Sequence, residues 1–417
     1  MIQYISTNGI GNAWVANEVR RVEEAGLPVE VAALWRDSAN FFDSEWAARI
    51  DRQTNYLYPI ALHRAALALL LAPFRFGARF WGCLWNAAFG PRESISIRAK
   101  SFLHLVVACH WAAMLRGRKV DRIHSQWIHS GGTVGMYAAR LLGVPFSFTG
   151  HAADLFRERC ALTDKIRAAD RIVCISEFHR RFFLEQGARP EQLIVVYCGI
   201  DVDHFAPIPP RKADGRLEIR SSGRLVEKKG FADLIAACAI LKERGVDFRC
   251  VIGGSGPLED DLRRRIADHG LGEYVELTGQ AIKQERIPEF MEGGDVYCLP
   301  CVWAADGDVD GLPQMLMEAM ACGLPAVSTR LVGIPDLVVD GVRGLRVGPG
   351  DVSSLADALE RLSGDADLRR RLAGAARRAV EDRFNLHTCL GPLLETFRGG
   401  PTPSAPSRSA SLAGAAA

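Results

Sequence analysis

Two carboxylates in the second half of the sequence have the spacing expected of one ligand site. Asp310 lies in a predicted loop, and Glu318 follows eight residues later inside a predicted helix that ends at the Gly-Leu-Pro sequence at 323–325. Pro313 is expected in the first turn of this helix, where its missing N–H costs nothing. A helix N-terminus at the carboxyl edge of a parallel sheet is suited to binding phosphate. The segment therefore predicts a site for a phosphorylated ligand.

Two cations earlier in the chain supply the positive charge that such a ligand needs. Arg224 follows a predicted strand, and Lys229 immediately precedes Gly230 at the start of a predicted helix. Both side chains can therefore reach one anion, whereas Lys228 is expected to be solvated. Cations aimed at a departing diphosphate are the main requirement for moving a sugar from a nucleotide. Glu318 lies among apolar residues and needs partners if it is buried, and two ribose hydroxyls would supply them.

Four short motifs, in order and spacing, resemble those of a known enzyme family. The segment from Asp310 to Glu318 is similar to the E-x7-E signature of family 4 glycosyltransferases, with Asp310 in place of the first Glu. Residues 197–201, 222–230 and 253–257 are similar to the family's P-N-G-V-D, G-R-L-x-x-x-K-G and G-x-G-P elements. The resemblance covers most of residues 1–390. It implies an α/β fold with two Rossmann-like parallel-sheet domains facing each other across a cleft, the GT-B architecture.

The resemblance also implies which residues form the site. The implied catalytic residues are His151, Arg224, Lys229 and Asp310. The implied donor-binding residues are Gly9, Gly11, Arg224, Lys229, Gly311, Leu312, Pro313 and Glu318. In these roles Arg224 and Lys229 hold the diphosphate, Glu318 holds the ribose and Asp310 contacts the donor sugar, with Asp306 and Asp308 close enough to share its work. No metal and no cofactor are expected beyond the nucleotide diphosphate sugar, which is a co-substrate.

Several of these residues have an alternative interpretation. The glycine turn at 8–11 allows close approach to the donor's phosphate or to the acceptor, but it could equally serve tight packing. His151 ends a predicted strand, where it can contact the donor sugar, position the acceptor or be structural. Residues 308–310 spell D-x-D, the metal motif of another glycosyltransferase architecture, although they come late in the chain for that role. Cys298 and Cys301 lack the second pair that a structural zinc site requires.

Strand-like runs alternate with helical periods, which predicts parallel sheets in two α/β domains. Strands are expected at 2–6, 29–34, 120–124, 145–149, 171–175, 193–196, 217–222, 248–253, 274–278, 295–299, 325–328 and 343–347. The expected organisation is an acceptor-side domain at 1–206, a linker at 207–215, a nucleotide-sugar-binding domain at 216–383, a terminal helix at 384–398 that crosses back to the first domain, and a disordered tail at 399–417.

The composition excludes several other classes of protein. The length of 417 residues predicts two or three domains, and the net charge of only +2 gives no reason to expect nucleic-acid binding. Eleven cysteines, mostly in apolar runs, fit a reducing cytoplasm better than a secreted disulfide scaffold. The N-terminal sequence MIQYIS has neither the basic nor the long apolar region of a signal peptide.

Residues 60–119 depart from this average. They contain nine Lys and Arg residues and one acid, a local excess of 9 − 1 = +8, interleaved with Phe and Trp. Their longest apolar run, 65–74, is about half of what a membrane span needs. A basic, aromatic-rich helical region is typical of a segment that lies on an anionic membrane surface. The alternative is a helical excursion that packs on its own domain.

Together these features predict a retaining, metal-independent hexosyltransferase of the exopolysaccharide or colanic-acid type. The expected substrates are a nucleotide-sugar donor and a lipid-linked glycan acceptor at the cytoplasmic face of the membrane. Since no carboxylate of the first domain resembles a dedicated nucleophile, a front-face mechanism is expected. The alternatives are a GT-B phosphorylase, a nucleotide-sugar epimerase and a non-catalytic nucleotide-sugar-binding protein.

Overall fold

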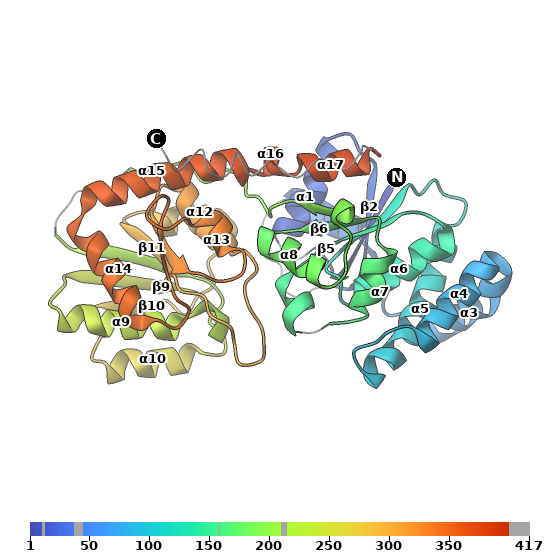
Figure 1. The fold of residues 1–417 in the computed structure, drawn as a ribbon, viewed down its shortest axis with the longest axis horizontal. Coiled ribbons are helices and arrows are strands. Elements are labelled where there is room, and N and C mark those ends of the chain that lie inside the picture. Colours follow the sequence, from blue (N-terminus) through green and yellow to red (C-terminus); the bar gives the residue numbers. More distant parts are fainter. Residues whose placement is uncertain (11–12, 37–44, 158, 210–214, 400–417) are drawn as a thin grey trace. The chain divides into compact units, whose positions relative to one another are not determined.

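The computed structural model describes residues 1–10, 13–36, 45–157, 159–209 and 215–399 (Figure 1). These residues form two compact units. Unit 1 contains Met1–Val196 and the segment that begins at Leu390, and unit 2 contains Tyr197–Cys389. Part of the expected linker, 210–214, and the expected tail from residue 400 onward lie outside the described residues.

Unit 1 is built on a parallel seven-stranded sheet with the order β3-β2-β1-β4-β5-β6-β7. Its strands are β1 (Ile2–Asn8), β2 (Val29–Trp35), β3 (Asn55–Tyr56), β4 (Arg122–Gln126), β5 (Phe146–Gly150), β6 (Arg171–Cys174) and β7 (Leu193–Val195). The strand order reverses between β1 and β4, and ligands bind at the carboxyl ends of strands at such a switch point.

The helices of unit 1 follow from local sequence signals. They are α1 (Ala13–Glu24), α2 (Glu45–Gln53), α3 (Leu62–Phe76), α4 (Ala78–Phe89), α5 (Ile95–Leu115), α6 (Ser130–Leu142), α7 (Leu162–Ala168) and α8 (Glu177–Glu185), with short turns η1 (Ala153–Arg157) and η2 (Pro190–Gln192). The Ser94 hydroxyl accepts a hydrogen bond from Ile97 N at the start of α5, and the Ser176 hydroxyl accepts one from His179 N at the start of α8.

Helices α3 and α4 form an outer layer on α5, away from the sheet (Figure 1). Gly77 separates the two helices in a left-handed conformation with φ 54°. This layer and α5 occupy the region that the sequence marks as basic and aromatic. No helix among the described residues is long and apolar enough to cross a membrane.

Unit 2 contains a second parallel sheet, with the order β10-β9-β8-β11-β12-β13. Its strands are β8 (Leu217–Ser222), β9 (Phe248–Gly253), β10 (Val275–Leu277), β11 (Val296–Leu299), β12 (Ala326–Thr329) and β13 (Leu345–Val347). Its longer helices are α9 (Phe231–Glu243), α10 (Glu259–Asp268), α12 (Gln314–Ala321), α14 (Val352–Gly364) and α15 (Ala366–Arg383). Its shorter helical elements are η3 (Glu227–Lys229), η4 (Gln284–Arg286), α11 (Ile287–Met291), α13 (Ile334–Leu337) and α16 (Leu386–Cys389).

The last described helix, α17 (Gly391–Phe397), belongs to unit 1 although it follows unit 2 in the chain. The Phe397 ring packs edge-on against Tyr4 and His124, which lie on the central strands of the first sheet. The chain thus leaves unit 1 after Val196 and returns to it at Leu390.

The predicted α/β class is confirmed, since each predicted strand overlaps a strand of the structure. Strand β3 was not predicted, because it is only two residues long. Pro313 was expected inside the first helical turn, but α12 begins one residue later at Gln314, so Pro313 precedes the helix with extended backbone angles.

Candidate functional site

The switch point of the second sheet brings together the loops that carry the predicted charges. Strands β8 and β11 are neighbours there. Arg224 and Lys229 follow β8, and Asp310 follows β11. Because the carboxyl ends of parallel strands lie at one edge of a sheet, these loops meet in the place where such folds bind ligands.

Lys229 and Asp310 form a direct ion pair in this place. Lys229 Nζ lies 2.6 Å from Asp310 Oδ2, and each side chain is largely buried. Burial alone lowers the pKa of Lys229, but the negative charge of Asp310 outweighs this and raises the pKa above its ordinary value. Burial alone raises the pKa of Asp310, but the positive charges of Lys229 and Lys228 outweigh this and lower the pKa below its ordinary value. Both groups are therefore charged at neutral pH.

The same ion pair belongs to a larger lysine–aspartate cluster, which we define as Lys228, Lys229, Asp308 and Asp310. Lys228 Nζ lies 3.1 Å from Asp308 Oδ2 and 3.2 Å from Asp310 Oδ1. The expectation that Lys228 is solvated is therefore wrong. The sequence could not predict where the Lys228 side chain points, because this depends on the position of the loop that follows β11. The Cys301 thiol also points at Asp310, with Sγ 3.7 Å from Oδ2. Cys301 is therefore part of this site.

Glycines allow the loops around this cluster to approach closely. Gly230 has φ 70°, and a Cβ atom there would lie 1.8 Å from the Pro300 carbonyl oxygen. Gly254 has φ 151°, and a Cβ atom there would lie 1.9 Å from the Gly223 carbonyl oxygen. The glycine motifs of the sequence are thus explained by backbone contact between neighbouring loops.

Arg224 is placed in the same loop but outside the cluster. Its side chain is exposed, whereas the next residue, Leu225, is fully buried and donates its backbone N–H to Ser255 O. Within the described residues no hydrogen bond or ion pair holds the Arg224 guanidinium. It is therefore available to an anion in solution.

Glu318 is the most unusual group of unit 2. It is 2% exposed in α12, and its Oε1 accepts a hydrogen bond of 2.8 Å from Gln284 Nε2. Its Oε2 is buried without a hydrogen-bond partner in the described parts of the chain. Burial raises the pKa of Glu318 from 4.5 to about 7, and Gln284 and Lys229 only partly offset this. A buried acceptor without a donor is costly, so the atom is suited to receiving a ligand hydroxyl.

The other predicted donor-binding residues of unit 2 form the approach to α12. Gly311, Leu312 and Pro313 are buried, and Gly311 O accepts a hydrogen bond from Gly333 N. The segment is thereby fixed between α12 and the turn before α13. Gln284 was not singled out from the sequence, since a glutamine in a polar loop carries no signal of its own.

In unit 1 the predicted residues lie at the switch point of the first sheet. Gly9 follows β1 with φ 40°, donates its N–H to Trp35 O, and accepts a hydrogen bond from the Ser6 hydroxyl through its own carbonyl. Gly11, the other glycine of this turn, lies outside the described residues. The turn is therefore tied to the ends of β1 and β2.

His151 follows β5 and is buried, with 5% of its surface exposed. Its Nε2 lies 3.1 Å from Gln126 Oε1, and its ring lies against Trp127 with centroids 4.7 Å apart. Burial lowers the pKa of His151 to about 3, and the nearby His179 and His124 act in the same direction. The ring is therefore neutral at physiological pH and can offer one donor and one acceptor.

Asp154 and His124, two other buried polar residues of unit 1, have structural partners. Asp154 accepts a hydrogen bond of 2.9 Å from Ile128 N. His124 is fully buried, with its two ring nitrogens within hydrogen-bond distance of the Ser147 and Thr149 hydroxyls. Lys165, which the sequence did not indicate, is also fully buried and donates hydrogen bonds to three backbone carbonyls.

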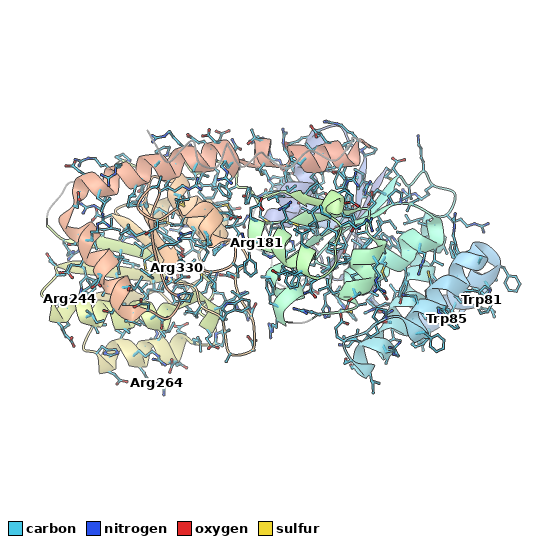
Figure 2. All side chains as sticks on the ribbon, in the orientation of Figure 1. Trp81, Trp85, Arg181, Arg244, Arg264 and Arg330 are labelled. Atoms are coloured by element: carbon cyan, nitrogen blue, oxygen red, sulfur yellow. The ribbon has the colours of Figure 1, made fainter. Side chains whose placement is uncertain are left out.

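The outer helical layer, defined as α3, α4 and the solvent side of α5, exposes many large apolar side chains. On α4, Trp81, Trp85 and Phe89 recur every four residues and are 56%, 68% and 67% exposed (Figure 2). The other large exposed apolar residues of this layer are Leu62, Leu67, Leu69, Leu70, Phe74, Ile95, Phe102, Leu103 and Met114. A helical layer that exposes this many large apolar side chains is a candidate interaction surface.

Several basic residues of the region 60–119 form hydrogen bonds or ion pairs within unit 1. The Arg92 side chain is fully buried, pairs with Asp164 at 2.5 Å and bonds the Tyr137 hydroxyl at 2.8 Å. Arg79 donates to Leu142 O, and Arg98 donates to Ala88 O. Arg92 therefore anchors the layer to the rest of unit 1 and is not exposed to an anionic surface.

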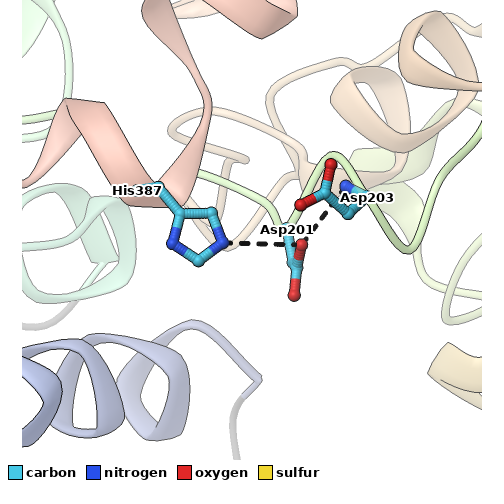
Figure 3. Close-up of side chains that lie close together, drawn as sticks. All are labelled: Asp201, Asp203 and His387. Atoms are coloured by element: carbon cyan, nitrogen blue, oxygen red, sulfur yellow. Dashed lines mark hydrogen bonds and ion pairs between the residues drawn. The ribbon is translucent and has the colours of Figure 1, made fainter.

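A separate group of metal-ligating residue types lies in unit 2, at the turn after Tyr197. Asp201, Asp203 and His387 have ligand atoms within 4.8 Å of one another (Figure 3). Asp201 Oδ1 accepts a hydrogen bond from Asp203 N and lies 3.8 Å from His387 Nε2. The group is solvent-accessible and shares no residue with the lysine–aspartate cluster, so the local turn accounts for it.

Comparison with known proteins assigns both units. The family model "Glycosyltransferase Family 4" matches residues 87–204, and "Glycosyl transferases group 1" matches residues 206–379. The chain is 32% identical over 393 residues to the putative colanic acid biosynthesis glycosyltransferase WcaL of Escherichia coli (strain K12), covering 89% of this chain and 92% of that protein. It is 40% identical over 222 residues to the amylovoran biosynthesis glycosyltransferase AmsK of Erwinia amylovora. That second alignment covers 53% of this chain and 54% of AmsK.

Solved structures show the same architecture at low sequence identity. Sucrose-phosphate synthase from Thermosynechococcus elongatus has a TM-score of 0.70 and 18% identity, covering 95% of this chain and 98% of that one. Anabaena HepE in complex with UDP and glucose has a TM-score of 0.65 and 18% identity, covering 95% and 99%. At these identities the likeness shows the fold, and it confirms the predicted GT-B class with its two parallel-sheet units.

Proposed function

Because the chain belongs to the family 4 glycosyltransferases, we propose that it transfers a hexosyl group from a nucleotide diphosphate sugar to a glycan acceptor. The observation that carries the donor assignment is the pairing, in unit 2, of a charged lysine–aspartate cluster with a buried Glu318 oxygen that has no donor in the described residues. The first suits a diphosphate and the second suits a ribose hydroxyl.

Each group of unit 2 has a defined role in this proposal. Arg224 and Lys229 bind the two phosphates, and the N–H groups at the start of α12 add to the positive potential. Glu318 accepts hydrogen bonds from the ribose. Asp310 holds Lys229 in place and contacts the donor sugar. Gly311, Leu312 and Pro313 fix the loop that carries Asp310 to α12.

The transfer is proposed to retain the configuration of the sugar carbon. The bond between that carbon and the phosphate oxygen breaks, and the acceptor oxygen bonds to the same face of the carbon. The acceptor's proton passes to the departing phosphate oxygen, so the step needs no protein nucleophile. His151, neutral and buried in unit 1, contacts the sugar through a hydrogen bond.

The positive charge for this step is proposed to come from side chains and the N-terminus of α12, without a metal ion. Two lysines already occupy both aspartates of the D-x-D sequence, Asp308 and Asp310. A divalent cation would have to displace both lysines from their partners.

The acceptor is proposed to be a lipid-linked glycan of exopolysaccharide or capsule assembly, reached at the cytoplasmic face of the membrane. Relatives named for colanic acid and amylovoran biosynthesis support the class of product. The outer helical layer supports the location, because aromatic residues on one helix face with nearby cations suit an anionic bilayer surface. A protein that binds in this way is peripheral.

Donor choice is tested by mixing the protein with individual UDP- and GDP-sugars. A true donor at 100 times its Kd should stabilise the protein by about 2.7 kcal/mol, which thermal unfolding detects. The same donors are then offered with lipid-linked acceptor and the product analysed. If a nucleotide sugar stabilises the protein but no transfer, isomerisation or phosphorolysis is observed, the protein is a non-catalytic nucleotide-sugar-binding protein.

Membrane binding is tested by sedimentation with vesicles that contain anionic lipid. The wild-type protein should sediment at low salt and be largely released at high salt, because each basic residue near the surface contributes about 1 kcal/mol that salt screens. Replacing Trp81, Trp85 and Phe89 with Ser should weaken this binding and leave donor affinity unchanged. A matched control reverses the charge of three arginines on the exposed helix α10 of unit 2, Arg263, Arg264 and Arg265 (Figure 2 labels Arg264). Equal loss in both variants, or no sedimentation of the wild type, would overturn the membrane proposal.

A further inference from the structure

We infer that Glu18, acting through Gln126, is a positioning residue that fixes the ring orientation and tautomer of His151. The inference rests on the proposed contact between His151 and a sugar. It adds Glu18 and Gln126 to that site and specifies which nitrogen of His151 donates a hydrogen bond and which accepts one. All of the groups involved lie in unit 1, around the switch point of the first sheet.

A continuous buried chain of hydrogen bonds connects these side chains. The Tyr4 hydroxyl donates to Glu18 Oε1 at 2.9 Å, and Gln126 Nε2 donates to the same oxygen. At the other end of the Gln126 amide, Oε1 lies 3.1 Å from His151 Nε2. Tyr4 and Gln126 are 1% exposed, and Glu18 is 8% exposed, so little water competes for these bonds.

The polarity of the chain follows from what each group can donate. An ionised carboxylate only accepts hydrogen bonds, so the NH2 end of the Gln126 amide must face Glu18. The carbonyl end then faces His151, and a carbonyl also only accepts. His151 must therefore carry its proton on Nε2, which makes Nδ1 the accepting nitrogen of the neutral ring. Any group that meets Nδ1, including a sugar hydroxyl, must be a donor.

The other buried histidines of this region have hydrogen-bond partners of their own. His124 Nε2 is 3.9 Å from Glu18 Oε1, but its ring nitrogens are within hydrogen-bond distance of Ser147 and Thr149. Burial keeps His124 neutral, as it does His179. Glu18 is therefore the carboxylate that Gln126 contacts, and the two histidines are uncharged neighbours.

Trp127 holds the His151 ring from another direction. It directly follows Gln126 and has φ 69°, a left-handed conformation that bulky residues rarely adopt. The Trp127 and His151 rings are 4.7 Å apart and tilted by 36°. Such unfavourable backbone conformations are retained where the surroundings require them and cluster at functional sites. Gln126 and Trp127 thus fix His151 by hydrogen bonding and by ring contact, respectively.

The tautomer can be measured without substrate by long-range 1H–15N correlation NMR of 15N-histidine protein at pH 8, where Glu18 is ionised. The His151 signals are assigned by their loss in His151→Gln. We expect the wild type to show a proton on Nε2. In Glu18→Gln, a neutral amide can present either end to Gln126, so a form with the proton on Nδ1 should become populated. Tyr4→Phe is the matched control, since it removes a hydrogen bond to Glu18 without touching Gln126, and it should leave the tautomer unchanged.

A second variant covers the case in which Glu18→Gln fails to fold. Gln126→Leu removes the accepting oxygen next to His151 and leaves Glu18 unchanged, so a form with the proton on Nδ1 should become populated. A wild-type proton on Nδ1, or His151 signals that are identical in the wild type and both variants, would overturn the inference. Because these readouts need no donor, they stand apart from whether the transfer reaction is observed.

Kinetics provide the remaining arm once a donor is known. Glu18→Gln should lower kcat about five- to tenfold, the effect of one misaligned hydrogen bond, and leave the KM for the donor nearly unchanged. Loss confined to KM would assign Glu18 to binding instead, which contradicts a role through His151.

Discussion

Among the described residues, each unit contains a buried glutamate whose pKa is raised to about 7, and these two glutamates differ in how their oxygens are satisfied. Burial raises the pKa of both Glu18 and Glu318 to about 7. In unit 1, Glu18 accepts hydrogen bonds from Tyr4 and Gln126. In unit 2, Glu318 accepts one from Gln284, and its other oxygen has no partner among the described residues. Burial alone therefore does not identify a ligand site, whereas an unpaired buried acceptor does.

The two glutamates also differ in the charge of the groups around them. Near Glu318 lie two lysines and two aspartates in mutual ion pairs. Near Glu18 lie histidines that burial keeps neutral. A charged cluster suits the anionic leaving group of a nucleotide sugar, and a neutral hydrogen-bonding network suits a sugar's hydroxyls. The contrast supports a division of work in which unit 2 binds the nucleotide and unit 1 acts on the sugar.

The largest effect is expected from removing the central cation of unit 2. Lys229→Ala deletes a preorganised donor to the departing diphosphate and should lower the rate of transfer by about 10²–10³. Lys242→Ala, an exposed lysine on α9 that donates to Gly270 O, is a matched control and should be neutral. Single-turnover kinetics measure the chemical step, and circular dichroism checks the fold. An unchanged rate would exclude both Lys229 and Arg224 from the proposed diphosphate site.

A smaller effect is expected from neutralising the unpaired carboxylate. Glu318→Gln keeps the hydrogen bond with Gln284 but replaces a charged acceptor by an amide, so nucleotide affinity should fall about tenfold, roughly the value of one hydrogen bond to a charged group. Isothermal titration measures this directly. Glu18→Gln is the paired control and should bind nucleotide normally. Unaltered affinity in Glu318→Gln would make Glu318 a structural residue.

Much of this arrangement could be predicted from the sequence, and the reasons are physical. The bounds of β8, β9 and α15 follow from apolar periodicity and helix signals, which are local. The chemical types at 224, 229, 310 and 318 were found through motifs. The ion pairs could not be predicted, because their members are far apart in the sequence. Lys228 and Asp308 are eighty residues apart, and Arg92 and Asp164 are seventy-two residues apart. Gln284 and Gln126 carry no pattern at all, since their importance lies in the groups they orient.

The pH dependence of stability tests the two glutamates together. Their folded-state pKa lies above the unfolded value, so their stabilising contribution is present below about 4.5 and is lost as pH rises through about 7. Glu318→Gln should therefore raise the Tm of donor-free protein by a few degrees at pH 8, at about 2–4 °C per kcal/mol, and change it little at pH 5. Glu18→Gln should gain less, because the Glu18 carboxylate accepts two hydrogen bonds that an amide accepts more weakly. Differential scanning fluorimetry measures both. Equal gains would remove the distinction between the glutamates.

The smallest effect is expected from metal removal, which should leave transfer unchanged. Asp308 and Asp310 have the spacing of a metal-binding D-x-D pair, but their oxygens face the ammonium groups of Lys228 and Lys229 at 2.6–3.2 Å. A divalent cation at Asp310 would have to displace two lysines and leave their charges beside its own. Activity in EDTA should therefore equal activity with Mn2+, in wild type and in Asp201→Asn, which alters the separate group with Asp203 and His387. Activity that is lost in EDTA and returns with Mn2+ would restore the D-x-D interpretation. If that dependence vanished in Lys228→Ala, the lysines and the metal would not be competing for the same aspartates.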